Sequence, residues 1–258
     1  MSSPAEPGHP GRYDGLRGDD IAEGLALPHA VIFDTIGSTL DVAHALAEEG
    51  APAGTLVLAD AQSAGRGRQG RTWHSERGAG IWLTLVERPS DVAALDVLSL
   101  RIGLGLARAL DAFATEAIRL KWPNDLFVGD RKLGGILVEA RWRAGSPEWV
   151  AIGVGVNVRA PSGEARATGL RDDAVRLAVL EAIVPAIRTA AACVGPLDES
   201  ELRAFAERDL AAGRRCVEPV TGTVRGIDAS GALLVHVPSD EPRTVAVRSG
   251  SLLLEETP

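Results

Sequence analysis

The sequence contains few of the residues that cross-link a chain or hold a soft metal. Among 258 residues there are two cysteines, one methionine and one tyrosine, and aromatic residues make up 4%. Cys193 and Cys216 belong to no CxxC pair and have no ligand-like histidine nearby, which argues against a disulfide framework and a zinc site. We therefore expect two ordinary thiols in a reducing compartment.

Long apolar runs and an excess of basic charge are also missing. A membrane span needs roughly 18–20 apolar residues, whereas the stretch over residues 149–158 has only the length of a strand. The first 30 residues lack the basic start and apolar core of a signal peptide. Lys and Arg number 27 against 35 Asp and Glu, a net charge of −8, which argues against wrapping duplex nucleic acid. These absences predict a soluble cytoplasmic protein with neither a membrane nor DNA as its partner.

The remaining composition is that of an ordinary globular protein. Hydrophobic residues make up 45% and charged residues 24%, which excludes disordered, collagen-like and fibrous chains. A chain of this length can bury roughly 70–75% of its unfolded surface, so its core needs no metal or disulfide. At roughly 150 residues per domain, the length allows one large domain, alone or with a small one.

The order of the apolar runs predicts an α+β fold. Strand patterns cluster in the middle of the chain instead of alternating with helices, so we expect a mixed, largely antiparallel sheet covered by helices. The expected strands lie at 31–34, 55–59, 81–86, 117–121, 126–128, 132–141 and 149–158, and the expected helices at 40–49, 95–113, 171–193 and 198–211.

The two ends of the chain differ from the middle. Residues 1–28 hold four prolines and five glycines without periodicity, which predicts a loose N-terminal arm. Residues 221–254 form short β runs separated by Ser-Gly and Pro-Ser-Asp turns, a pattern typical of a small β-barrel. We therefore expect an arm over 1–28, a large domain over 29–212 and a small barrel over 213–258.

The segment Gly65-Arg66-Gly67-Arg68-Gln69-Gly70-Arg71-Thr72-Trp73 combines backbone freedom with positive charge. Its glycines let the backbone approach a ligand closely. Its three arginines are expected to point into one small volume, which would suit phosphate or carboxylate oxygens. A solvated basic turn is the alternative, and the segment is not a Gly-Lys-Ser/Thr phosphate loop.

A second informative segment is Lys121-Trp122-Pro123-Asn124-Asp125. A lysine at the end of a strand and before a proline lies where the chain changes direction, and its ammonium could stabilise charge on a phosphate undergoing attack. Asn124 and Asp125 offer oxygens of the kind that Mg²⁺ binds. The alternative is an Asn/Asp turn with a surface lysine.

Glycines also interrupt two expected strands, at Lys132-Leu133-Gly134-Gly135 and at Gly153-Val154-Gly155-Val156-Asn157. Glycine weakens a strand and usually marks the close approach of a ligand or another backbone. These strands could form the floor of a narrow pocket for a flat ring, with β-bulges in a twisted sheet as the alternative. His44 and His74 are expected to be structural or solvent-facing.

Taken together, these segments resemble the biotin protein ligases, also called biotin–[acetyl-CoA-carboxylase] ligases. The resemblance runs from about Asp34 to the C-terminus. It rests on Gly37-Ser38-Thr39, Gln62 with the GRGRQGRTW loop, KWPND, KLGGILVE and GVGVN, and on Arg225-Gly226-Ile227-Asp228 near the end. It implies a class II synthetase-like biotin/lipoate ligase domain with a small SH3-like barrel.

The resemblance also implies an activity. Biotin and ATP would form biotinyl-5′-adenylate and pyrophosphate with Mg²⁺ present, and the biotinyl group would pass to a lysine of a biotin carboxyl carrier domain of acetyl-CoA carboxylase or a related carboxylase. Such an activation needs cations that offset the repulsion of two anions. Both monomers and homodimers occur in the family.

The resemblance assigns site residues as follows. Lys121, Arg66 and Arg68 would carry catalytic charge; no metal would be held directly by a cage of protein side chains, although Asp125 could contact Mg²⁺. Biotin would be bound by Ser38, Thr39, Gln62, Gly65, Arg66, Gly67, Arg68, Lys121, Gly135, Gly153 and Gly155. ATP and the adenylate would be bound by Arg66, Arg68, Arg71, Trp73, Lys121, Asn124 and Asn157.

The sequence departs from the family in two places. Leu40 stands where members commonly have Asn, and the roughly 30 residues before Val31 are too few for the winged-helix domain of bifunctional members. We therefore expect a monofunctional ligase. The alternatives are a lipoate or octanoate ligase or transferase, a biotin-sensing repressor and an inactive biotin-binding scaffold.

Overall fold

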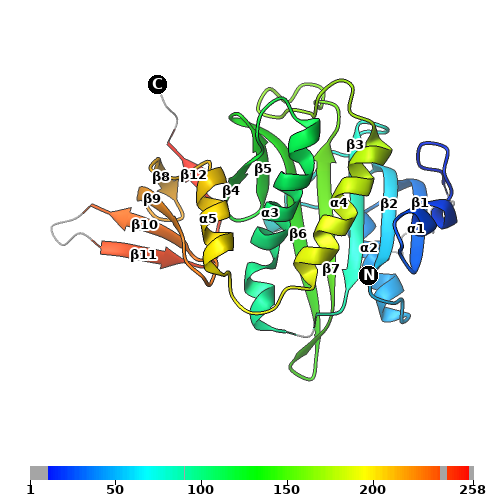
Figure 1. Cartoon of the computed structure of the whole chain (residues 1–258), viewed down its shortest axis with the longest axis horizontal. Coiled ribbons are helices and arrows are strands. Elements are labelled where there is room, and N and C mark those ends of the chain that lie inside the picture. Colours follow the sequence, from blue (N-terminus) through cyan, green and yellow to red (C-terminus); the bar gives the residue numbers. More distant parts are fainter. Residues whose placement is uncertain (1–10, 90, 239–242, 256–258) are drawn as a thin grey trace.

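The computed structural model describes residues 11–89, 91–238 and 243–255 of the chain. The strands form two sheets that lie side by side along the long axis of the molecule (Figure 1). The larger sheet has seven strands in the order β1-β2-β3-β7-β6-β5-β4, and the smaller has five in the order β11-β10-β9-β8-β12.

The larger sheet is antiparallel except for one pair. β1 and β2 run parallel, and every other neighbouring pair in it is antiparallel, which confirms the expected α+β class. β6 and β7 form a long hairpin in which Gly135 pairs with Gly155. The strands are β1 His29–Ile36, β2 Thr55–Gln62, β3 Gly80–Glu87, β4 Arg119–Lys121, β5 Asp125–Val128, β6 Arg131–Arg143 and β7 Ser146–Asn157.

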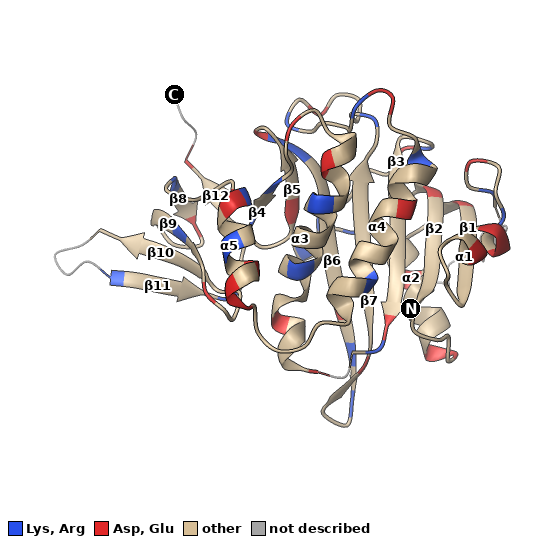
Figure 2. Cartoon of the chain, viewed as in Figure 1, with Lys and Arg blue, Asp and Glu red and all other residues tan. Residues whose placement is uncertain are grey.

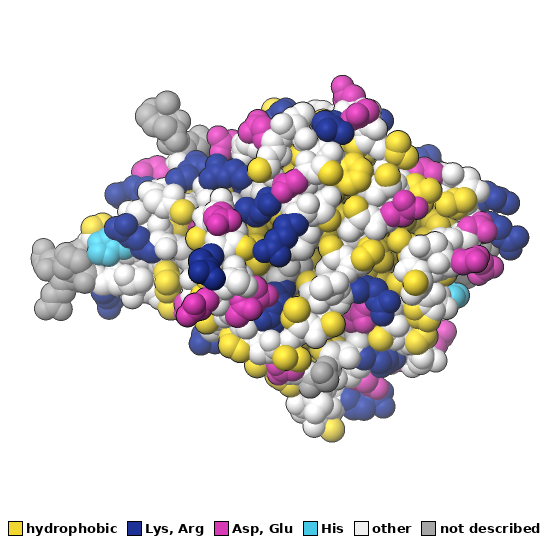
Figure 3. Space-filling model, in the orientation of Figure 1, with side chains coloured by type: hydrophobic (Ala, Val, Ile, Leu, Met, Phe, Trp, Pro, Cys, Tyr) yellow, Lys and Arg dark blue, Asp and Glu magenta, His cyan; other side chains and the backbone are white. Residues whose placement is uncertain are grey.

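Helices cover both faces of this sheet. α3 (Leu98–Leu110) and α4 (Arg176–Ala191) pack on one face, and their charged positions are marked in Figure 2; two of these, Arg101 and Arg176, are buried. α2 (Thr39–Glu48) packs on the other face over Val57, Val86 and Trp149. On the face shown in Figure 3, acidic and basic side chains are interspersed, as expected of a solvated surface. The other helical segments are α1 Gly18–Gly24, α5 Glu199–Arg208 and the 3₁₀ turns η1 Arg68–Gly70, η2 Ala93–Val97 and η3 Asp111–Phe113.

The smaller sheet is joined to the larger body by a buried hydrogen bond and a shared apolar core. The indole of Trp122 donates to the carbonyl of Gly231 at 2.9 Å, and Leu233 and Val235 on β10 belong to the same apolar core as the larger sheet. Its strands are β8 Arg215–Glu218, β9 Gly222–Ile227, β10 Leu233–Val237, β11 Arg243–Val247 and β12 Leu253–Leu254.

The prediction of a loose arm over residues 1–28 is wrong for residues 11–28, while residues 1–10 lie outside the described residues. Tyr13 is fully buried, with the Arg176 guanidinium 4.0 Å from its ring centroid. The Gly11 amide donates to the Ile32 carbonyl on edge strand β1 at 2.8 Å. At the opposite edge, the Leu210 amide donates to the Leu120 carbonyl of β4 at 2.8 Å. The arm therefore packs through non-local contacts that its local composition does not reveal.

The expected helix over 171–193 begins later, at Arg176. The segment before it is held by the chain beside it, since the Arg171 amide donates to the Phe113 carbonyl. Among the described residues, no helix has the length and apolarity needed to cross a membrane.

Candidate active site

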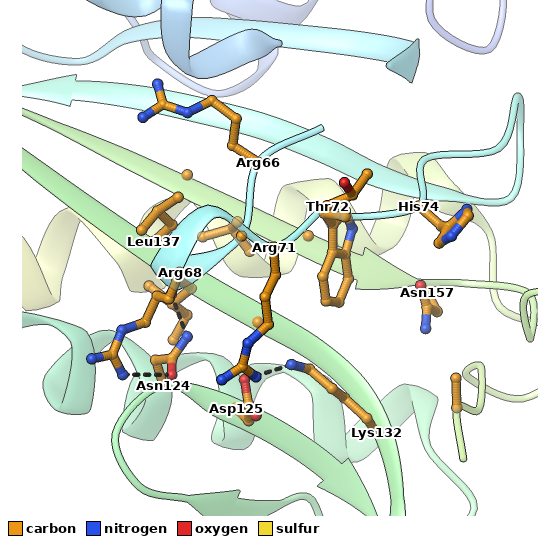
Figure 4. Close-up of a pocket in the computed structure, with 18 of the residues that line it drawn as sticks. Arg66, Arg68, Arg71, Thr72, His74, Asn124, Asp125, Lys132, Leu137 and Asn157 are labelled. Carbon is orange, nitrogen blue, oxygen red and sulfur yellow. Dashed lines mark hydrogen bonds and ion pairs between the residues drawn. The ribbon is translucent and has the colours of Figure 1, made fainter. Parts of the chain in front are cut away.

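One cavity lies between the glycine-bearing strands β6 and β7 and the Gly65–Trp73 loop (Figure 4). It gathers segments that are far apart in the sequence: the start of α2, the end of β2, the loop, the Lys121–Asp125 segment and the strand glycines. The sequence-predicted residues that line it are Ser38, Thr39, Gln62, Arg66, Gly67, Arg68, Arg71, Trp73, Lys121, Asn124, Asp125, Gly135, Gly153, Gly155 and Asn157.

One end of the cavity is uncharged and hydrogen-bonded. The Gln62 side-chain oxygen accepts from the amide and the hydroxyl of Thr39, at 2.8 and 3.1 Å. The Thr84 hydroxyl donates to the Thr39 hydroxyl at 2.9 Å, and the Gln62 amide nitrogen donates to Ser75 at 2.8 Å. The Ser38 hydroxyl lines the same end and is buried without a hydrogen-bond partner in the structure. A buried hydroxyl beside a fixed amide can complement a neutral polar ligand.

The floor of the cavity depends on glycine. A Cβ atom on Gly155 would lie 2.5 Å from the Trp73 indole nitrogen, and one on Gly153 would lie 3.1 Å from a Leu40 methyl group. Leu40 is itself buried. Leu40, which replaces the asparagine common in the family, therefore packs against strand β7 at Gly153. This apolar contact holds the start of α2 against the sheet without a polar side chain at position 40.

The other end of the cavity is basic. Lys132 pairs with Asp125 at 2.7 Å and lies over the Trp73 ring, 5.3 Å from its centroid. Arg68 donates to the Asn124 side-chain oxygen at 3.1 Å. Burial lowers the pKa of the Lys121 ammonium; the Asp125 carboxylate opposes this, while Lys132 and other cations lower it further. Burial also lowers the pKa of Arg68. This concentration of like charge favours an anionic ligand.

Arg66 does not join the other two arginines, so the expectation of three guanidiniums in one volume is wrong. Its guanidinium binds Asp41 on α2 at 2.8 Å and Glu139 on β6 at 2.5 Å. In Figure 4 it points away from Arg68 and Arg71, which face Asn124 and Asp125. The carboxylates on α2 and β6 attract the Arg66 guanidinium, whereas the cations at the basic end of the cavity repel it.

Two stretches of this chain match known protein families. Residues 33–157 match the Biotin/lipoate A/B protein ligase family, and residues 217–255 match the Biotin protein ligase C terminal domain. The biotin–[acetyl-CoA-carboxylase] ligase of Paracoccus denitrificans is 36% identical over 210 residues, which cover 71% of this chain and 84% of that protein. The chain belongs to the biotin protein ligase family.

Other relatives are biotin ligases as well, but the share of each relative that this chain matches varies. The bifunctional ligase/repressor BirA of Bacillus spizizenii is 41% identical over 135 residues, 52% of this chain, and the match spans only 42% of that protein. A biotin protein ligase structure from Aquifex aeolicus, in complex with biotin and ATP, superposes with a TM-score of 0.70 at 23% identity. It covers 88% of this chain and 99% of its own, and shows that the fold is shared.

Two predicted residues of this biotin protein ligase family member have mainly local structural contacts. Gly65 does not line the cavity. A Cβ at this position would lie 2.4 Å from the Trp73 carbonyl oxygen, so the two ends of the loop can pair this closely only if residue 65 is glycine. Asn157 lines the cavity but uses its amide to donate to the Thr168 carbonyl at 3.1 Å. The Trp73 indole nitrogen is buried without a partner in the structure and lies against Gly155.

Sequence reasoning missed two residues that line the cavity, Lys132 and Ser251, and a third, Thr84, that supports the cavity residue Thr39. Lys132 opens the KLGG segment, and its pairing with Asp125 across the β5–β6 hairpin could have been inferred from a charged pair flanking a turn. Thr84 offered no signal within its strand. Ser251, from the smaller sheet, accepts from Arg71 at 2.6 Å and donates to Gln69 at 2.9 Å, and no local pattern predicts a contact across 180 positions.

The side chains expected to contact Mg²⁺ do not fit a metal held by the protein. The Asp125 carboxylate pairs with Lys132, and both ends of the Asn124 amide are engaged, with Arg68 and with the Ile136 carbonyl. Among the described residues, no group of three or more His, Cys, Asp or Glu side chains could hold a metal ion. These contacts suit Asp125 to positioning cations.

Proposed function

We propose that this chain is an ATP-dependent biotin protein ligase. The observation that carries the proposal is the asymmetry of its cavity, which has a buried uncharged hydrogen-bonding end and an opposite end with Arg68, Arg71, Lys121 and Lys132. Biotin has a matching asymmetry, with a neutral ureido ring at one end and a carboxylate at the other. ATP adds further negative charge at the carboxylate end.

The proposed reaction has two steps. An oxygen of the biotin carboxylate attacks the α-phosphorus of ATP, the bond to the β-phosphate oxygen breaks, and pyrophosphate leaves with its electron pair. The ε-amine of an acceptor lysine then attacks the acyl carbon of biotinyl-5′-adenylate. AMP leaves, and the amine gives a proton to solvent. Neither step needs a nucleophilic side chain of the ligase.

We assign the residues by their position in the cavity. Ser38, Thr39 and Gln62 bind the ureido ring over the floor made by Gly135, Gly153 and Gly155. Lys121 and Arg68 reduce the repulsion between the carboxylate and the α-phosphate, a stabilisation that grows as charge develops on phosphorus. The nucleotide is bound by Arg71, Trp73, Lys132, Asn124 and Asn157. The Gly65–Trp73 loop covers the adenylate and excludes water from the reactive anhydride.

The acceptor that we propose is a lysine of a biotin carboxyl carrier domain of acetyl-CoA carboxylase or a related carboxylase. Support comes from the name of the Paracoccus relative and from the shared family. We also propose that residues 29–212 form the catalytic domain and that the domain over 213–258 assists it, because Ser251 reaches the loop arginine Arg71.

The decisive experiment is ATP–pyrophosphate exchange with biotin, lipoate and octanoate supplied separately, each with MgATP. Exchange that only biotin stimulates supports the proposal, whereas stimulation by lipoate or octanoate instead identifies a lipoate-type ligase. Mass spectrometry of a purified carrier domain, incubated with enzyme, biotin and MgATP, then tests transfer. Biotin binding without exchange or transfer would identify an inactive scaffold.

A further inference from the structure

Arg66 lies between two carboxylates that belong to different layers of the fold. Its Nη1 donates to Asp41 on α2, and its Nη2 donates to Glu139 on β6. The Asp41 side chain is 61% exposed, whereas that of Glu139 is 28% exposed. Solvent screening weakens the first pair more than the second, so Glu139 provides the stronger attachment.

Glu139 is in turn held by a histidine and a buried tryptophan. Its Oε2 lies 3.1 Å from Nε2 of His44, and Nδ1 of His44 lies 3.0 Å from the indole nitrogen of Trp149. An indole N–H can only donate, so Nδ1 is the acceptor and the proton of the neutral imidazole is on Nε2. His44 therefore donates to Glu139, and the buried Trp149 fixes the far end of this chain of contacts.

We propose that Glu139 is a positioning residue that anchors the first part of the Gly65–Trp73 loop through Arg66, and that His44 holds Glu139 in place. The catalytic consequence rests on the ligase function proposed above. With Arg66 neutralised by carboxylates and tied to α2 and β6, the loop moves as a flap from Gly67 onward. Arg68 and Arg71 are then the arginines that respond to bound anions.

The internal hydrogen bonds of the loop allow this to be measured without any ligand. The Gly67 amide donates to the Arg71 carbonyl at 2.7 Å, and the Trp73 amide donates to the Gly65 carbonyl at 2.8 Å. Both bonds pair the first part of the loop with its last part, so amide hydrogen exchange at Gly67 and Trp73 reports on separation of the two parts once the first part is no longer anchored. We expect Glu139→Gln to speed exchange at both amides by about threefold to tenfold, as for a partly exposed ion pair.

A matched control lies on the same hairpin. Glu148 pairs with Arg143 at 2.8 Å, and its side chain is also 28% exposed. Glu148→Gln should leave exchange at Gly67 and Trp73 unchanged. The anchor is overturned if Glu139→Gln exchanges at the wild-type rate, or if both variants speed exchange equally. The melting temperature of each variant separates a local effect from a general loss of stability.

The part played by His44 is tested by non-additivity. His44→Ala should speed exchange by about twofold to threefold alone and add nothing in the Glu139→Gln background, because both act through one contact. Effects that multiply would show that His44 acts separately and would overturn its role. His44→Ala that lowers the melting temperature without altering loop exchange would do the same.

Enzyme kinetics provide the link to function. Glu139→Gln should release biotinyl-adenylate about threefold to tenfold faster, as the loop opens more often, while the KM for biotin stays within about twofold. Unchanged adenylate release with faster exchange would overturn the catalytic consequence. If the wild-type protein forms no adenylate, the proposed function fails, and the exchange data still decide whether Glu139 anchors the loop.

Discussion

The two ends of the cavity are stabilised in different ways. At the uncharged end, Thr39, Thr84 and Gln62 are already hydrogen-bonded to one another and largely buried before a ligand arrives. At the basic end, Lys121 and Arg68 are partly buried near other cations, so the free protein is destabilised there by charge repulsion and burial. The comparison indicates that ring recognition is preformed, whereas the basic end is completed by the anions that it binds.

The largest effect should come from the basic end. Lys121→Ala should reduce adenylate formation by on the order of 10²–10³, the usual cost of removing one contact to developing charge. Biotin binding should weaken far less, because the ring is held at the other end. Single-turnover adenylation and biotin titration measure the two separately. Adenylation within a few-fold of wild type would contradict the role of Lys121.

The uncharged end should show the opposite pattern. Gln62→Ala leaves the Thr39 amide without its acceptor, and a lost partner in a buried network costs about 1–3 kcal/mol. Biotin affinity should fall by about tenfold to a hundredfold, while adenylation at saturating biotin changes only a few-fold. Ser63→Ala, next in the chain and outside the cavity lining, is the control. Equal losses in both measurements would remove the distinction between the two ends.

A smaller effect is expected from the loop. Arg68→Gly removes the contact with Asn124 and should release the adenylate on the order of tenfold faster, since the flap loses one charge-assisted hydrogen bond. Biotin should then appear on bystander proteins with exposed lysines. Arg77→Ala, whose guanidinium binds Asp60 and Thr35 instead, should retain the intermediate. Equal retention by Arg68→Gly would limit Arg68 to binding ATP.

The pH dependence sharpens the same comparison. Because burial lowers the pKa of Lys121, the folded protein loses this proton at a lower pH than an ordinary lysine does. Its charge costs stability below the folded pKa, and the cost disappears as the pH rises toward about 10.4. The adenylation kcat/KM should fall over that alkaline window. Asp125→Asn should move the fall to lower pH, whereas Asp130→Asn, at an exposed pair with Arg214, should not.

The smallest effect concerns the acceptor. A ligase with a net charge of −8 gains little long-range attraction toward an acidic carrier domain, so recognition should rest on local contacts. The kcat/KM for the acceptor should stay flat or rise as salt approaches physiological levels. A steep fall in stopped-flow or mass-spectrometric rates would show that charge steers the encounter.

Local sequence predicts the parts of the site whose chemistry is local. The loop glycines and arginines, the Lys121–Asp125 turn and the strand glycines stand together in short segments, and all of them except Gly65, Gly70 and Gly134 line the cavity. Side-chain directions depend on distant partners. Arg66 binds residues 25 and 73 positions away, and nothing within its own segment distinguishes it from Arg68.

In the fold, too, features that depend on local sequence could be predicted, whereas features that depend on distant contacts could not. Periodicity predicts most strands of the larger sheet because their apolar faces pack on helices. Residues 11–28 have no periodicity, yet Tyr13 is buried beneath Arg176, which also binds Asp60 at 2.6 Å. One aromatic ring over a distant guanidinium fixes a segment that composition marks as loose, so that contact could only be found in three dimensions.

The hydrogen bonds on the two edge strands of the larger sheet have a consequence for the solubility of the protein at high concentration. An open edge presents unpaired N–H and C=O groups that template the addition of strands from other molecules. Here the Gly11 amide donates a hydrogen bond to the Ile32 carbonyl of β1, and the Leu210 amide donates one to the Leu120 carbonyl of β4. These contacts occupy backbone groups that could otherwise pair with another chain, so we expect a chain shortened to begin after Pro28 to aggregate more readily.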